Sequence, residues 1–450
     1  MRLITLNSIN NMGKIIIYSV LILGLLPKSN AQTTRTHPPA PSAGVTVPQM
    51  LYPQVPQLQV PTLQSMVAEQ QQRVQQQNNA MIQADMMQYE RQKQQAQSII
   101  DESVKEFQPI SYEFPDNSHF HTSKYFREAF AEISEMLEGK KDLSLKRAVF
   151  ITENAYLENS RNYDWFCSDL TTNVDLIQSF LKKEDLSPNN DLAKKYMLQR
   201  FLADTLTMRD DKGNHQITHL PFKYDFDDPF GKKDWSKMFV TKLLSSKSGQ
   251  CHSLPLLYLI LADELDIKAW MSYSPQHSYI KLQGDKGIWY NYETTNGNYS
   301  ADSWVLSSGL VKSEALQSGI YMDTLTRKET IAATLADLAK GYAIKFGFDK
   351  FVLDCVNKAL EYHPNNVYAL QIKADYYTFL FHYVRKQLNY PPKERIHLYP
   401  KANEILQKMY ANYGQLDQIG YETMPEEAYK SWLKSFETEK GKQPFKIIKP

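Results

Sequence analysis

One short stretch limits the possible folds more than any other part of the chain. The residues Gly249-Gln250-Cys251-His252-Ser253 lead directly into an apolar run that ends at Leu265. This run predicts a helix, and a helix tolerates Pro255 only in its first turn, where the missing N–H is not needed. The sequence therefore predicts that Cys251 lies at or just before the N-terminus of an apolar helix.

A cysteine at this position has the surroundings of a nucleophile. The unpaired N–H groups and the positive end of the helix dipole stabilise a thiolate, which lowers the pKa of the thiol. The same N–H groups can stabilise an oxyanion on a carbonyl under attack. We therefore expect Cys251 to be a catalytic nucleophile, whereas Cys167 and Cys355 are interpreted as small buried hydrophobic residues.

Three strand-like segments follow the helix, at residues 268–273, 277–282 and 287–294, and a hairpin connection over 283–287 joins the last two. His277 opens the middle segment, and Asn291 and Glu293 share one face of the third. A thiol nucleophile needs an imidazole partner and a third group that fixes the imidazole tautomer. His277 fits the first role, and either Glu293 or Asn291 fits the second.

The motif around Cys251, together with His277 and residues 289–295, resembles the transglutaminase-like cysteine hydrolase superfamily. It most resembles a bacterial branch in which a transglutaminase-like core is followed by tetratricopeptide-like helices, and the resemblance covers about residues 120–365. It implies an α+β fold of the papain/transglutaminase type, with the nucleophile helix packed on a small antiparallel sheet. The third residue of the catalytic triad in that superfamily is usually Asp. Glu293 occupies the place here, and Asn291 could serve instead, as Asn does in papain-like sites.

The N-terminus has the pattern of a signal peptide over residues 1–31. Arg2 and Lys14 precede an apolar run over 15–26, and Ser29-Asn30-Ala31 resembles a cleavage site. The run is too short to span roughly 30 Å of hydrocarbon as a stable helix. We expect export to the periplasm or beyond the cell, within the bacterial envelope, with no membrane span after cleavage. An uncleaved anchor is the alternative.

Two segments of unusual composition follow. Residues 32–65 are rich in proline and predict an extended linker. Residues 66–107 are rich in glutamine, contain no Pro or Gly, and predict a solvated helical tether. Val67, Val74 and Met81 are seven residues apart, which leaves a coiled coil as an alternative.

The rest of the chain is expected to form a transglutaminase-like domain over 108–325 and a tetratricopeptide-like helical region over 326–450. Apolar residues at helical spacing predict helices over 125–137, 144–157, 174–181 and 191–206, followed by a long loop over 209–235 with room for one strand. In the C-terminal region, residues 332–366 resemble one tetratricopeptide unit, residues 368–410 suggest a second, and residues 426–436 suggest a closing helix. Such helices suit a protein partner.

Composition excludes other classes. Lys and Arg number 51 against 50 Asp and Glu, so charge gives no reason to expect a nucleic-acid partner. Three cysteines cannot build a disulfide scaffold or a four-cysteine zinc site. The histidine pairs His119/His121 and His215/His219 lack an evident third ligand, so neither a metal nor another cofactor is expected.

The leading hypothesis is an exported cysteine hydrolase or acyltransferase. It would act on amide bonds of a protein or peptide substrate through Cys251, His277 and either Glu293 or Asn291. Whether the chain turns over substrate stays open. The alternatives are an inactive transglutaminase-like scaffold that binds a protein partner in the cell envelope, and a secreted structural coiled-coil protein.

Overall fold

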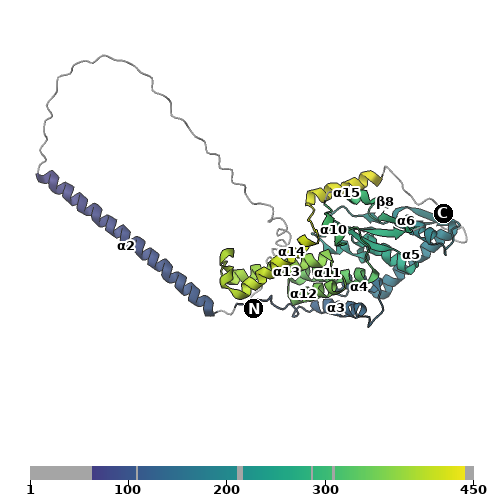
Figure 1. Ribbon diagram of the computed structural model, residues 1–450, viewed down its shortest axis with the longest axis horizontal. Helices are drawn as coiled ribbons and strands as arrows, with labels where there is room; N and C mark the ends of the chain where they lie inside the picture. The colour runs from purple at the N-terminus through teal and green to yellow at the C-terminus, as the bar shows by residue number, and fades with distance from the viewer. Residues whose placement is uncertain (1–62, 108–109, 210–215, 285–286, 307–309, 441–450) are drawn as a thin grey trace, which may run out of the picture. The chain divides into compact units, whose positions relative to one another are not determined.

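The computed structural model describes residues 63–107, 110–209, 216–284, 287–306 and 310–440 (Figure 1). These residues form two compact units, which are described separately: helix α2 (Leu63–Phe107), and the described residues from Ser111 onward. The signal peptide and nearly all of the proline-rich linker expected from the sequence lie outside the described residues.

Helix α2 runs for 45 residues. Its length follows from its composition, because it contains no Pro or Gly and is dominated by good helix formers. The side chains described on it, over residues 68–99, are exposed to solvent. The prediction of a helix over 66–107 is therefore confirmed.

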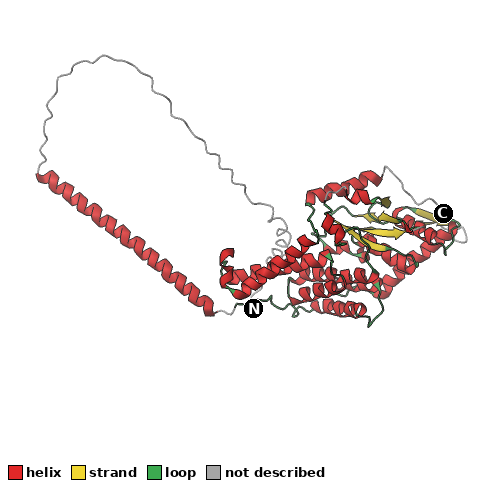
Figure 2. Cartoon of the chain, in the orientation of Figure 1, coloured by secondary structure: helices red, strands yellow, loops and turns green. Residues whose placement is uncertain are grey.

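The second unit combines helices with small sheets, which confirms the α+β class (Figure 2). Its helices up to the sheet are α3 (Ser123–Leu137), α4 (Leu145–Tyr156), α5 (Tyr163–Lys183), α6 (Asp191–Ala203), α7 (Val240–Ser246) and α8 (Ser253–Glu264). Those after it are α9 (Asp302–Leu306), α10 (Ser313–Gln317), α11 (Arg327–Phe346), α12 (Lys350–Tyr362), α13 (Val367–Gln387), α14 (Pro400–Gln418) and α15 (Glu426–Lys440). Short 3₁₀ helices cover Trp235–Met238 and Lys393–Leu398.

The largest sheet is antiparallel and has the order β5-β6-β7-β8. Its strands are β5 (Trp270–Ser274), β6 (His277–Gln283), β7 (Trp289–Glu293) and β8 (Asn298–Ser300). The three predicted strands and their hairpin order are confirmed, and β8 adds a fourth strand that the sequence pattern did not indicate. Because His277 starts β6 and Glu293 ends β7, the hairpin brings these two residues to the same end of the sheet.

The segment predicted as a long loop carries more structure than expected. β1 (Leu206–Arg209) pairs with β2 (Gln216–His219) in antiparallel fashion, and β3 (Lys223–Tyr224) pairs in parallel with β4 (Ser248–Gly249). These strands have two to four residues, which is too short for a period-two pattern to be recognised.

Two predicted helix limits were wrong. α5 begins at Tyr163, eleven residues before the predicted start, because the Asn162 side chain accepts a hydrogen bond from the N–H of Trp165 and caps the helix there. Polar residues alternate with the apolar ones in the first turns of α5, so the helical spacing of the apolar residues was not recognised there. α6 ends at Ala203 and not at residue 206, since Leu206 already belongs to β1.

Helix α8 is almost wholly buried. Its residues from Ser253 to Ala262 are all buried, as expected of a helix that is apolar on every side. It packs against β5 and β6 on one side and against α5, α6 and α7 on others.

The helices after residue 326 share their packing with the first helices of the unit. A capping box between Thr326 and Glu329 starts α11, which packs on α3, α4, α12 and α13, while α13 packs on α14. No helix in the described ranges is both long enough and apolar enough to cross a membrane.

Candidate active site

The residues before α8 form a tight loop that fixes Cys251. The N–H of Gln250 donates a hydrogen bond to Ser253 Oγ (3.0 Å), and Ser278 Oγ donates one to the carbonyl oxygen of Cys251 (2.5 Å). A Cβ atom added to Gly249 would lie 2.6 Å from Ser253 Oγ, closer than side chains approach each other. Cys251 thus sits one residue before the N-cap of α8, and Pro255 lies in the first turn, as the sequence predicted.

His277 and Glu293 form a buried pair. His277 Nε2 lies 2.7 Å from Glu293 Oε2, and both residues are 1% exposed. Ser300 Oγ donates a hydrogen bond to the other carboxylate oxygen of Glu293 (3.2 Å). Both oxygens are therefore engaged, so the carboxylate is held in one orientation toward the imidazole.

Asn291 lies apart from the histidine. Its side-chain amide donates a hydrogen bond to Asp302 Oδ1 (2.7 Å). The two residues left open by the sequence thus have different neighbours: Glu293 contacts His277, and Asn291 contacts Asp302 in α9.

The Cys251 thiol interacts with the imidazole of His277. Burial by itself would raise the pKa of Cys251, but the hydrogen bond and charge of His277 lower it below its usual value, with a smaller effect from Tyr429. Burial would lower the pKa of His277, but Glu293 and Cys251 raise it. The two shifts have opposite directions, and both favour a thiolate next to an imidazolium.

Two tyrosines also lie at the thiol. The Tyr429 hydroxyl, from α15, is 3.4 Å from Cys251 Sγ. Burial and the charge of Cys251 raise the pKa of Tyr224, from β3, so this hydroxyl stays protonated near neutral pH. Sequence reasoning missed both residues, because Tyr429 is 178 positions from Cys251 and neither belongs to a motif.

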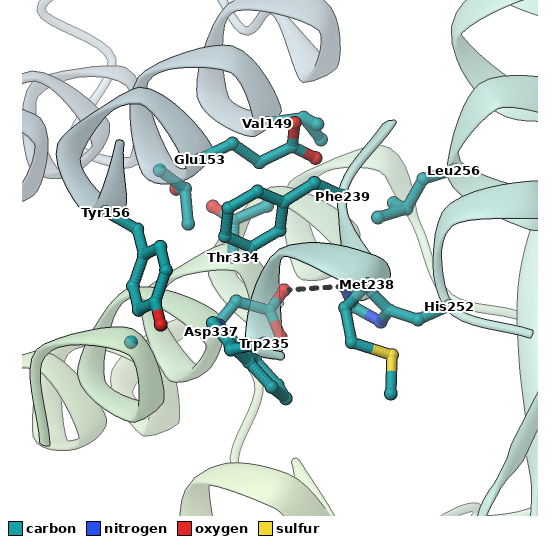
Figure 3. A pocket seen from close by; sticks show the side chains of 12 residues that line it. Val149, Glu153, Tyr156, Trp235, Met238, Phe239, His252, Leu256, Thr334 and Asp337 are labelled. Carbon is teal, nitrogen blue, oxygen red and sulfur yellow. Dashed lines mark ion pairs between the residues drawn. The ribbon is translucent and has the colours of Figure 1, made fainter. Parts of the chain in front are cut away.

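A small cavity lies behind the nucleophile loop and encloses about 20 Å³, which is room for about one water molecule (Figure 3). His252 and Asp337, from α11, form an ion pair at its edge, with His252 Nε2 3.3 Å from Asp337 Oδ2. Glu153 of α4 accepts hydrogen bonds from the N–H groups of Val240 and Thr241 at the start of α7. Burial raises the pKa of Glu153 to about 7. The cavity is therefore lined both by His252, the residue after the nucleophile, and by side chains of helices α4 and α11.

The remaining cysteines and histidines lie elsewhere. Cys355 is fully buried in α12, Cys167 is half-buried in α5, and neither forms a disulfide. His219 stacks on Phe201 at 3.7 Å between ring centroids, and burial lowers its pKa to about 4. His119 bonds the carbonyl oxygen of Asp116, and His215 lies outside the described residues. Within the described ranges, no group of three or more His, Cys, Asp or Glu side chains is arranged to hold a metal ion.

Three comparisons were made with known proteins. The scan against protein-family models, the search of curated proteins and the search of solved structures each found no match to this chain. The functional interpretation therefore depends on the geometry around Cys251.

Proposed function

We propose that the chain is an exported cysteine hydrolase or acyltransferase with a transglutaminase-like core, acting on amide bonds in proteins or peptides. One observation carries the proposal: Cys251, His277 and Glu293 meet in one buried cluster. Its members are a thiol before a helix, an imidazole near enough to lower the pKa of that thiol, and a carboxylate 2.7 Å from the imidazole. These are the parts that a thiol nucleophile requires.

In the proposed reaction, the Cys251 thiolate attacks the carbonyl carbon of an amide. The C–N bond then breaks, and the leaving amine takes the proton of the His277 imidazolium, so that a thioester remains on Cys251. Water or a second amine next loses a proton to His277 and attacks the thioester. The products are a carboxylic acid or a new amide, and the thiolate is restored.

The other residues have supporting roles in this proposal. The Glu293 carboxylate fixes the imidazole through Nε2, so Nδ1 is the ring nitrogen assigned to proton exchange with the thiol. It also stabilises the imidazolium form. The N–H groups at the start of α8 are the candidate donors to the oxyanion.

A test of this function compares the full chain with Cys251→Ala and, as a matched control, Cys167→Ala. Each is incubated with a tryptic peptide mixture, with and without the amine monodansylcadaverine. Mass spectrometry then detects cleaved, deamidated or amine-coupled peptides. We expect products from the wild type and from Cys167→Ala and none from Cys251→Ala. Products that persist in Cys251→Ala would contradict the assignment of the nucleophile.

A second candidate function is an inactive scaffold that binds a protein partner through its C-terminal helices. The observation in its favour is that Cys251 is only 8% exposed and its thiol is in contact with Tyr429. The scaffold hypothesis predicts that no condition gives a product dependent on Cys251. It also predicts that substituting Cys251 leaves partner binding unchanged.

A further inference from the structure

The last helix, α15, lies directly over the candidate active site. Besides the contact of Tyr429 with the thiol, the indole of Trp432 packs on the His277 imidazole, with 4.8 Å between ring centroids and an interplanar angle of 78°. Two residues one helical turn apart therefore cover the nucleophile and its imidazole partner.

Aromatic side chains from other elements of the unit contact both of these residues. The ring of Phe230, from the loop before the first 3₁₀ helix, lies 4.7 Å from the ring of Tyr429, measured between centroids. Trp304 of α9 stacks on Trp432, with 5.3 Å between ring centroids. At the rim, Lys232 forms an ion pair with Glu426 (2.6 Å). The contacts to α15 thus engage an acidic residue followed by two aromatic residues at successive three-residue steps.

Apart from this face, α15 is bound loosely. Of the side chains described on it, only Tyr429 is buried, and most of the others are exposed. Local opening of a segment with so little buried surface needs far less free energy than global unfolding.

A substrate carbonyl and Tyr429 of α15 cannot contact the Cys251 sulfur together. A carbonyl carbon under attack must come within about 3–3.5 Å of the sulfur, and the Tyr429 hydroxyl already lies in this range. We propose that α15 occupies in cis the surface of the Cys251 site on which a substrate would bind, and that displacing it admits polypeptide segments with an acidic residue and aromatic residues in the same arrangement. The substrate part of this proposal rests on the proposed function, whereas the occupation of the site by α15 does not.

The test measures how fast iodoacetamide alkylates Cys251 in the full chain, read at the Cys251 peptide by mass spectrometry. In Tyr429→Ala/Trp432→Ala, we expect the rate to rise about tenfold or more, because the thiol loses its cover. The matched control is Glu427→Ala/Ser431→Ala on the exposed face of the same helix, which should label at the wild-type rate. An unchanged rate in the aromatic double variant would overturn the proposal.

A peptide added in trans then tests recognition. The synthetic peptide of residues 424–440 should slow the alkylation of Tyr429→Ala/Trp432→Ala back toward the wild-type rate. The same peptide with alanine at both aromatic positions should have no effect. Equal effects of the two peptides, or no effect of either, would refute recognition of the aromatic pair.

A milder variant covers the case in which the double variant does not fold. Lys232→Glu leaves the buried side chains in place and removes the ion pair at the rim, together with the cation–π contact of Lys232 with the Phe230 ring (5.2 Å to the ring centroid). It should raise the alkylation rate up to about fivefold, and adding Glu426→Lys should restore it. No increase in Lys232→Glu, or no restoration, would refute the contribution of this contact. These rates report access to the thiol, so they hold or fail independently of whether any product dependent on Cys251 is found.

Discussion

The ion pair between His252 and Asp337 gives a prediction whose sign depends on pH. Burial would lower the pKa of His252, but Asp337, with smaller effects from Cys251 and Glu153, raises it from 6.5 to about 9. A difference of this size corresponds to about 3 kcal/mol of stability. Because 34% of the His252 side chain is exposed, solvent screening reduces this to about 1–2 kcal/mol.

The pH range follows from the direction of the shift. A histidine whose pKa is higher in the folded state stabilises the fold fully below its unfolded pKa of 6.5, and the contribution is lost as the pH rises through about 9. We therefore expect Asp337→Asn to lower the free energy of unfolding by about 1–2 kcal/mol at pH 6 and by close to nothing at pH 9.5.

Urea unfolding of the full chain, followed by tryptophan fluorescence at both pH values, measures this difference. His252→Gln is the control background, in which Asp337→Asn should show no loss that depends on pH. An equal loss at pH 6 and pH 9.5 in the wild-type background would refute the electrostatic reasoning. It would indicate that Asp337 contributes only through packing.

Three further predictions concern the fold. Gly420→Ala should be strongly destabilising in thermal unfolding, because Gly420 has φ +81° and an added Cβ would collide with the backbone N of Ala315. An unfolding temperature equal to that of the wild type would contradict this prediction. Leu257→Ala, at a fully buried position of α8, should cost about 2–5 kcal/mol in urea unfolding, and a loss below about 1 kcal/mol would show that the structure collapses into the space left by the removed side chain. Limited proteolysis should cut within the exposed helix α2 before it cuts the second unit, and resistance of residues 63–107 would indicate a packed coiled coil.

Local chemistry made much of this site predictable. Pro255 located the start of the nucleophile helix in the sequence, because a helix accommodates proline only in its first turn. Alternation in the strand after the hairpin put Asn291 and Glu293 on one face. Alternation could not choose between them, because the choice depends on the register of β6 with β7 and on Asp302, which holds Asn291.

The parts that escaped prediction depend on contacts between distant segments. A closing helix was expected over 426–436, but nothing in its sequence indicated that it lies on Cys251. The same holds for Asp337, which belongs to no motif of the sequence analysis and pairs with His252. Such contacts follow from how the helices pack in the complete unit, which periodicity does not report.

The central claim is that His277 and Glu293 hold Cys251 as a thiolate, and its most direct test is the alkylation rate of Cys251 against pH. In the full chain, we expect substantial alkylation below the usual thiol pKa of about 8.5, and a shift of the profile to higher pH in His277→Ala. Glu293→Gln should shift the profile in the same direction, while Asn291→Ala should change it less. If Asn291→Ala mimics His277→Ala and Glu293→Gln behaves as wild type, the acidic assignment is wrong. If none of the three variants moves the profile, Cys251 is an ordinary buried thiol, and the proposed catalytic function is contradicted.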